Sequence, residues 1–256
     1  MKTGKRILVA LIVPIIILAL WYVATTFGSF PASILPSQQM VGNAFAEMTS
    51  DGQLQGDLMI SLGRVLKGFL ASAIVGVFLG SVMGMSKKMQ NLLLPTITVI
   101  RQIPMVAWIP LIILWSGIGE SSKVIIIMIA AVFPILVNTL SGIESTPGGY
   151  VEVARLYKLG KWKTFTKVYL PHALPQILVG LKLGLGVSWM AVVASELIAA
   201  STGIGYRMNE ARSLMKSDKV IVCMIVIGLI GIIMDKLISL LFDQFTPWVH
   251  LQEKKK

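Results

Sequence analysis

The sequence predicts an all-α membrane protein with six transmembrane helices, and two observations carry this prediction. Hydrophobic residues make up 55% of the 256-residue chain, charged residues only 14%, and the mean hydropathy is +0.79. These values lie outside the composition of ordinary soluble domains. The apolar residues also form continuous runs, which favours helices over a transmembrane β-barrel because the strands of such a barrel alternate apolar and polar residues.

A helix needs roughly 20 apolar residues to cross the hydrocarbon core of a bilayer. The first run follows a basic start like that of a signal peptide, but its length and the lack of a small-residue cleavage site predict an uncleaved helix. The chain should form one membrane domain, with 1–59 as a helix plus an outer segment and 60–243 as a five-helix core. The expected spans are 7–27, 60–85, 95–116, 123–143, 173–200 and 219–243.

Basic residues predict the orientation of these spans. When the six spans are threaded in order, the Lys and Arg residues at both chain ends, at 87–88 and across 155–167 fall on one side. The positive-inside tendency assigns that side to the cytoplasm, although the outer loop 201–218 also carries basic residues. Both termini should then be cytoplasmic. Orientation explains the net charge of +11, so no nucleic acid is expected as a partner.

Smaller patterns predict features within this frame. Val41, Phe45 and Met48 recur at helical spacing in the outer segment 28–59, which indicates a short interfacial helix, with an ordinary connecting loop as the alternative. Pro104 should kink the third span. Small residues at four-residue intervals let helix backbones approach closely, and packing inside one bundle is favoured over a dimer seam. These packing residues are Gly76, Gly80 and Gly84.

The stretch EVARLYKLGKWKTFTKVYLP at 152–171 is a compact basic segment in this apolar chain. Its periodicity predicts two short amphipathic helices, with a turn at Gly160 and a stop at Leu170-Pro171. Two roles fit such a segment. It can lie on anionic lipid, or it can present a helix to a groove on a cytoplasmic partner.

The same stretch resembles the EAA loop of the permease subunits of bacterial ABC importers, through EVA, Gly160 and VYLP. SLGRVLKGF, RQIPMVAWIPLIILWSGIGE and LPHALPQILVGLKLGLGVSW are similar to the branch that imports nitrate, sulfonates and taurine. The similarity runs from about residue 34 to 236. The family usually has glycine where Lys158 stands here, which shifts the expected turn to Gly160.

The resemblance implies the type I ABC importer permease fold, in a bacterial inner-membrane protein that forms a homodimer surrounded by membrane lipid. Two ABC ATPase subunits should dock under the loops 144–171, and an extracytoplasmic solute-binding protein should deliver the solute. The chain has no G-x-x-x-x-G-K-[ST] phosphate loop, so ATP and Mg should bind to the partner ATPase, with no cofactor or enzyme activity in this chain. The implied coupling residues are Glu152, Val153, Ala154, Arg155, Lys158, Gly160, Leu170 and Pro171.

Candidate pathway or gate residues lie in the third and fifth spans. Arg101 suits an anionic solute if it faces the pathway. Glu196 is a candidate outer gate or binding-protein contact, or a structural partner of Arg101 or Lys182. No residues have metal-ligand spacing, so no metal site is expected. The full candidate set is Arg101, Pro104, Trp108, Trp115 and Glu196.

An aliphatic sulfonate ranks first among the expected solutes, followed by taurine and nitrate. A pyrimidine or vitamin-precursor importer has the same permease pattern and stays an alternative. A stand-alone secondary transporter is an alternative of a different class, and it predicts paired charges inside the membrane and two similar halves of the chain.

Overall fold

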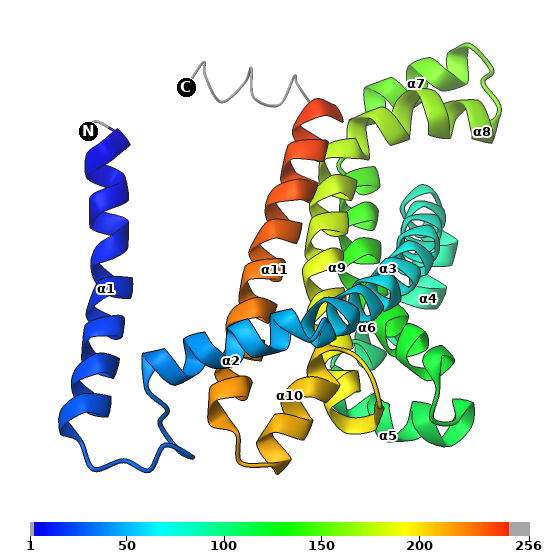
Figure 1. Ribbon diagram of the computed structural model, residues 1–256. Helices are drawn as coiled ribbons and strands as arrows, with labels where there is room; N and C mark the ends of the chain where they lie inside the picture. Colours follow the sequence, from blue (N-terminus) through cyan, green and yellow to red (C-terminus); the bar gives the residue numbers. More distant parts are fainter. Residues whose placement is uncertain (1–2, 246–256) are drawn as a thin grey trace.

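The structure is a computed structural model that describes residues 3–245, and every regular element in that range is a helix (Figure 1). Lys2 and the basic residues 254–256, which contributed to the predicted orientation, lie outside the described range. The helices are α1 (Thr3–Phe27), α2 (Gln38–Ser50), α3 (Gln53–Met85), α4 (Lys87–Ile100), α5 (Met105–Ser116), α6 (Glu120–Glu144), α7 (Gly148–Leu156), α8 (Lys161–Thr164), the π-helix η1 (Phe165–Tyr169), α9 (Leu170–Ala199), α10 (Ile204–Ser213) and α11 (Ser217–Phe245).

Four helical stretches in the described range are long and apolar enough to cross a membrane. They correspond to the predicted second, fourth, fifth and sixth spans. The apolar part of α1 is the shorter stretch Leu11–Phe27. The short helix predicted around Val41 is present as α2, and its Val41, Ala44 and Met48 side chains are buried.

The span predicted over 95–116 is sharply broken near Pro104, where the sequence predicts a kink. It contains the end of α4 and all of α5, and these two helices meet at an angle of 96°. Pro104 stands directly before α5 with an extended ψ of 135°, because a proline has no N–H for a helical hydrogen bond and forces an end or a kink. Together the two helices make one bent span or a re-entrant loop.

The stop predicted at Leu170-Pro171 is wrong, since an unbroken helical stretch runs from Lys161 to Ala199. The reason lies in the π-helix η1 just before Pro171. The Leu170 N–H bonds the Phe165 carbonyl, five residues back, and this wider turn gives the helix a way to pass the residue that lacks an N–H.

Helices α3, α6 and α9 pack most closely, and glycines make this approach possible. A Cβ atom added at Gly76 would lie 2.8 Å from the Ile135 side chain of α6, and one at Gly84 would lie 2.6 Å from Ile143. At Gly80 it would lie 2.7 Å from the Leu136 carbonyl oxygen. The face predicted from these three glycines therefore packs inside the bundle, against α6.

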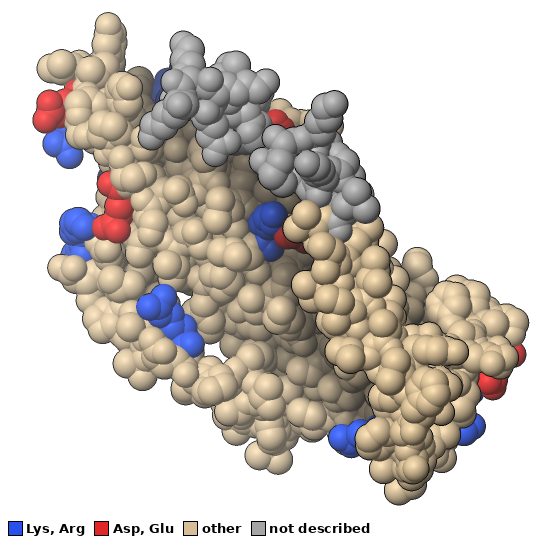
Figure 2. Space-filling model, turned by 90° about the vertical axis from the view of Figure 1, so that its left-hand side faces the viewer, with Lys and Arg blue, Asp and Glu red and all other residues tan. Residues whose placement is uncertain are grey.

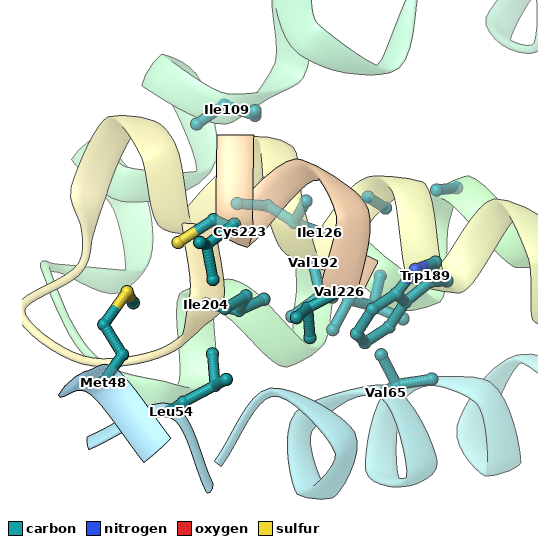
Figure 3. Close-up of a cluster of buried hydrophobic side chains, with 14 of the residues drawn as sticks. Met48, Leu54, Val65, Ile109, Ile126, Trp189, Val192, Ile204, Cys223 and Val226 are labelled. Atoms are coloured by element: carbon teal, nitrogen blue, oxygen red, sulfur yellow. The ribbon is translucent and has the colours of Figure 1, made fainter. Parts of the chain in front are cut away.

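Figure 3 shows the main hydrophobic core, in which buried side chains of several helices meet. Met48 of α2, Val65 of α3 and Ile126 of α6 point into it together with side chains of α9, α10 and α11. Cys223, the single cysteine, is fully buried there. This core fixes the short helices α2 and α10 against the long ones.

The bundle has two distinct ends (Figure 1). Helices α7 and α8 project from one, which we call the α7 end, and α5 and α10 lie at the other, the α10 end. Helix α1 begins and α11 ends at the α7 end (Figure 1). Lys87 lies at the α7 end as well, where it pairs with Glu144 at 2.7 Å. This arrangement places 87–88 and 155–167 on one side, as the charge pattern predicts.

Helix α1 stands apart from the rest of the bundle (Figure 1). Two hydrogen bonds tie it to the segment that follows: Trp21 donates to the Pro36 carbonyl at 3.0 Å, and Gln38 donates to the Leu18 carbonyl at 2.9 Å. Its large apolar side chains, such as Leu20, are exposed. The face of the molecule on that side carries few charged side chains (Figure 2), as an integral membrane protein requires.

Candidate functional site

The predicted coupling segment forms helix α7 and its following turn at the α7 end. Ala154 is buried, whereas Val153, Leu156 and Tyr157 are 51%, 81% and 78% exposed. Ala154 therefore turns toward the bundle, and the larger apolar side chains face outward. Such an apolar surface on a helix that projects from the bundle is suited to contact with another protein.

The turn after α7 lies at Lys158, so the prediction that Gly160 makes it is wrong. Lys158 has a left-handed backbone (φ 49°), whereas Gly160 is extended (φ −66°, ψ 160°). The Leu159 N–H bonds the Ala154 carbonyl and the Lys158 N–H bonds the Arg155 carbonyl. These two bonds define a Schellman cap, whose left-handed position is usually glycine. The turn thus occurs where the importer family usually has its glycine.

Glu152 and Arg155 lie on the side of α7 that faces the neighbouring helix ends. They line a polar cleft of about 330 Å³ with Lys87, Glu144 and Tyr169. Both side chains belong to exposed residues. Leu170 and Pro171, at the start of α9, bound the coupling segment on its other side, and Pro171 lines a second cavity of about 450 Å³ beside Val153 and Tyr157.

Three of the candidate pathway residues lie together. Arg101, Pro104 and Trp108 line a cavity of about 530 Å³ at the break between α4 and α5, where α6 contributes Asn138 and Phe133. Arg101 is exposed and has no ion-pair partner within residues 3–245. The guanidinium of Arg101 can therefore neutralise an anion that enters this cavity.

Trp115 and Glu196 lie away from that cavity. Trp115 is 70% exposed near the end of α5. Glu196 is 1% exposed, and its carboxylate accepts a hydrogen bond from Arg64 at 2.7 Å. The predicted structural partners of Glu196, Arg101 and Lys182, are wrong, because Lys182 pairs with Asp235 instead. Spacing along the chain gave no information on which basic residue of another helix reaches Glu196.

Glu196 belongs to a polar cluster that holds the start of α10. The first N–H groups of a helix have no partner within it and need acceptors elsewhere. Here the Gly203 N–H bonds the Asp57 carboxylate, the Ile204 N–H bonds the Ser61 hydroxyl, and the Gly205 N–H bonds the Glu196 carboxylate. The negative charges of Asp57 and Glu196 also stabilise the positive end of the α10 dipole.

Arg64 connects this cluster to two further elements. It donates to Glu196, to the carbonyl and hydroxyl oxygens of Thr202, and through both Nε and Nη2 to the two carboxylate oxygens of Glu120 at the start of α6. Its residue exposure is only 2%. A buried guanidinium with its donors used in this way is stable only while those partners stay in place.

Arg207 links α10 back to α3. Its Nε donates to the Asp57 carboxylate at 2.8 Å, and its Nη1 donates to Glu210 at 2.6 Å. Burial alone lowers the pKa of the Arg207 guanidinium, but the hydrogen bond and charge of Asp57, together with Glu210, raise this pKa above its ordinary value. Asp57 thus neutralises one of the basic residues of the loop 201–218.

The sequence reasoning missed Asp57, Ser61, Thr202 and Arg207 as members of this cluster. A signal was present for two of them. Asp57, Ser61 and Arg64 are spaced by four and then by three residues, so they share one face of α3. No signal of this kind exists for Thr202 and Arg207, whose positions depend on how the loop after α9 folds back.

Comparison with known proteins identifies the family of this chain. Residues 72–250 match the model of the binding-protein-dependent transport system inner membrane component family. The chain belongs to this family. The permease is 36% identical over 95% of its length to a protein of Bacillus subtilis named as an aliphatic sulfonates transport permease, SsuC, and covers 88% of it.

A further relative supports the same assignment, and a solved structure shows the fold. The permease is 36% identical to the nitrate import permease NrtB of a Synechocystis strain, over 77% of its own length and 72% of that protein. Its fold matches the crystal structure of an amino acid ABC transporter with a TM-score of 0.63 at 18% identity, over 78% of its own length and 97% of that chain. The type I importer permease fold is thereby confirmed.

Proposed function

We propose that this permease forms the pathway of an ATP-driven importer for a small anionic solute. In this proposal two copies make the pathway, two ATPase subunits dock at the α7 end, and an extracytoplasmic binding protein delivers the solute at the α10 end. The α7 end and both termini are cytoplasmic, and the membrane is a bacterial inner membrane. ATP and Mg are bound by the ATPase, and the permease itself catalyses no reaction.

The observation that carries the proposal is the exposed face of α7. Val153, Leu156 and Tyr157 form an apolar surface on a helix that projects from the bundle, and burying such a surface against a partner is favourable. The basic residues on the same segment support its cytoplasmic location. A partner that moves when it binds ATP can push on α7 and, through the unbroken helical stretch Lys161–Ala199, on the bundle.

The cavity at Arg101 supports an anionic solute. The Arg101 guanidinium is exposed and lies beside Trp108 and the amide-bearing residues Gln102 and Asn138. Arginine and amide N–H groups are suitable donors for the oxygens of a sulfonate or a nitrate. Relatives named for sulfonates and nitrate support the same class, and we rank an aliphatic sulfonate first, then taurine and nitrate.

Transport in this proposal is a shift between two populated states and involves no covalent step in the permease. ATP binding brings the ATPases together and favours the state in which the pathway opens at the α10 end. Hydrolysis and release favour the state that opens at the α7 end. Each ligand acts only through its different affinity for the two states.

The test is copurification of the tagged full-length permease from its native membranes, comparing Glu152→Lys with Asp51→Lys. Both changes reverse the charge of an exposed residue, but Glu152 lies on α7 and Asp51 lies at the end of α2. We expect the native chain and Asp51→Lys to bring down an ATPase and a binding protein. Glu152→Lys should reduce the ATPase yield and uptake by about tenfold or more, because an unfavourable charge at an interface costs over 1 kcal/mol.

A permease that copurifies with no ATPase, and whose uptake survives Glu152→Lys, would overturn the proposal in favour of a stand-alone secondary transporter. If the ATPase is present, ligand screening on the binding protein identifies the solute. A pyrimidine or vitamin precursor in that screen, with no affinity for sulfonate, taurine or nitrate, would refute the anionic solute and keep the importer.

A further inference from the structure

An open apolar groove lies at the α7 end, between α3, α9 and the basic segment α8 with η1. It measures about 740 Å³. Ile74 and Phe78 of α3 line it and are 72% and 64% exposed, while Leu181 and Phe165 contribute its other walls. In water such a surface would be unfavourable, but beside a bilayer it has the size and character to hold an acyl chain.

The mouth of the groove has the residues of a membrane–water interface. Lys161 and Trp162, the first two residues of α8, line it, and Trp162 is 74% exposed. Tryptophan favours the level of the lipid headgroups, and lysine there places its ammonium group among them. The groove therefore runs from the headgroup level into the hydrocarbon region.

The charge of the segment selects the headgroup. Lys161, Lys163 and Lys167 lie on α8 and η1, and none of them forms an ion pair within residues 3–245. The apolar surface proposed for the ATPase is on α7, so these lysines lie outside that surface. Their positive charge at the headgroup level attracts anionic lipid.

We propose that this groove binds an anionic glycerophospholipid, with an acyl chain along Ile74 and Phe78 and the headgroup phosphate at Lys161. The site places a lipid against α8 and η1, the helical stretch that joins α7 and its turn to α9. It uses neither the Arg101 cavity nor the face of α7. Lipid binding and solute transport can therefore be tested separately.

The experiment measures which lipid contacts Trp162 in bilayers that contain the full-length permease with the subunits that copurify. All bilayers hold equal amounts of phosphatidylglycerol and phosphatidylcholine, and dibrominated acyl chains, which quench tryptophan fluorescence, are placed on one lipid or the other. The contribution of Trp162 is the difference between the native chain and Trp162→Phe. Because Trp162 is mostly exposed, this variant should fold.

We expect phosphatidylglycerol to be enriched about fivefold over phosphatidylcholine at Trp162, the preference that one lysine near an anionic headgroup provides. Lys161→Gln should reduce the enrichment to near one, and Ala73→Phe should do so by filling the groove, since Ala73 lines it. Lys163→Gln is the matched control, because Lys163 is on the same helix but does not line the groove. It should keep most of the preference.

Three results would overturn the proposal. Equal quenching by both lipids in the native chain would mean ordinary contact with bulk lipid. Absence of quenching by either lipid would mean that protein, such as a second copy of the permease, covers the groove. An equal loss in Lys161→Gln and Lys163→Gln would assign the preference to the overall charge of α8. None of these results bears on the importer proposal.

Discussion

The short helices α7 and α10 adjoin opposite ends of the segment that contains α9, and they are attached to the bundle in different ways. At α10 the first three N–H groups, from Gly203 to Gly205, bond side chains of α3 and α9, and Arg207 forms an ion pair with Asp57. Helix α7 has one buried side chain, Ala154, and no side-chain hydrogen bond from 148–156 is present in the described structure.

The contrast between α7 and α10 shows which of the two helices is available to a partner. The polar groups at the start of α10 are already satisfied inside the chain, so this helix is held to α3 and α9. The apolar and charged side chains of α7 have few partners inside the chain and are free for another protein. A region with few internal contacts is also where local opening costs least.

The largest expected effect comes from breaking the cluster at Arg64. Arg64→Met should lower the free energy of unfolding by about 3–5 kcal/mol, because it leaves the Glu196 carboxylate buried without its charged partner. Arg155→Met, which changes an exposed arginine of α7, should change it by at most about 0.5 kcal/mol. Denaturant titration in mixed micelles measures both values.

The double variant Arg64→Met with Glu196→Gln is the control for this explanation. It should recover part of the loss, since a neutral amide is less costly to bury than an unpaired carboxylate. Equal stabilities of the Arg64 and Arg155 variants would show that the α10 cluster does not hold that end of the molecule.

Adding a methyl group at Gly203 and at Gly160 should give the next largest difference in the free energy of unfolding. Gly203 has φ +107°, and a Cβ there would lie 2.4 Å from the Glu196 carboxyl carbon, so Gly203→Ala should cost about 2–4 kcal/mol through strain and overpacking. Gly160 has φ −66° and no neighbour within 4 Å of such a Cβ. Gly160→Ala should therefore be neutral or stabilise by up to about 1 kcal/mol.

Hydrogen exchange locates these two effects. In Gly203→Ala the amides of 203–205 should exchange faster, because their acceptors on Asp57, Ser61 and Glu196 are displaced. Gly160→Ala should leave the amides of α7 unchanged. Faster exchange throughout the chain in Gly203→Ala would instead indicate global unfolding and would remove the local interpretation.

The smallest expected effect concerns the caps. Lys158 and Met215 both have a left-handed backbone (φ 49° and 54°) after α7 and α10, and both make the two bonds of a Schellman cap. Lys158→Gly and Met215→Gly should each stabilise the chain by about 1 kcal/mol, since glycine has no Cβ to clash in this conformation. Thermal unfolding measures both.

Similar gains at both positions would sharpen the comparison, because they would show that local capping is the same at the two ends. The difference between α7 and α10 would then rest on tertiary contacts alone. A loss of stability in either variant would contradict the strain assigned to these left-handed residues.

Several features of the fold follow from patterns that are local in sequence. Length and apolarity predict where long helices run, and α6 and α11 differ from their predicted spans by at most three residues at either end. The glycine interval in α3 predicts a packing face, because a four-residue repeat places small residues on one side of a helix. The family motifs predict the type I permease fold.

The wrong predictions concern features that depend on contacts with other parts of the chain. Pro104 and Pro171 carry the same local information, a missing N–H, yet one stands at a 96° break and the other within a continuous helix. A π turn before Pro171 accommodates it, and the Phe165 and Tyr169 side chains of that turn pack against a core cluster that includes Ile143 of α6. Glycine preference likewise indicated Gly160, whereas the hydrogen bonds to Ala154 and Arg155 place the turn at Lys158.

The sequence by itself determined that this chain is helical, inserted in a membrane and a member of a permease family, because composition, periodicity and motifs are properties of neighbouring residues. Tertiary structure alone decided which charges meet. Arg64 and Glu196 are 132 residues apart in sequence and 2.7 Å apart in space. No periodicity specifies such a pair, since its formation depends on how α3 and α9 cross and how the loop to α10 folds back over them.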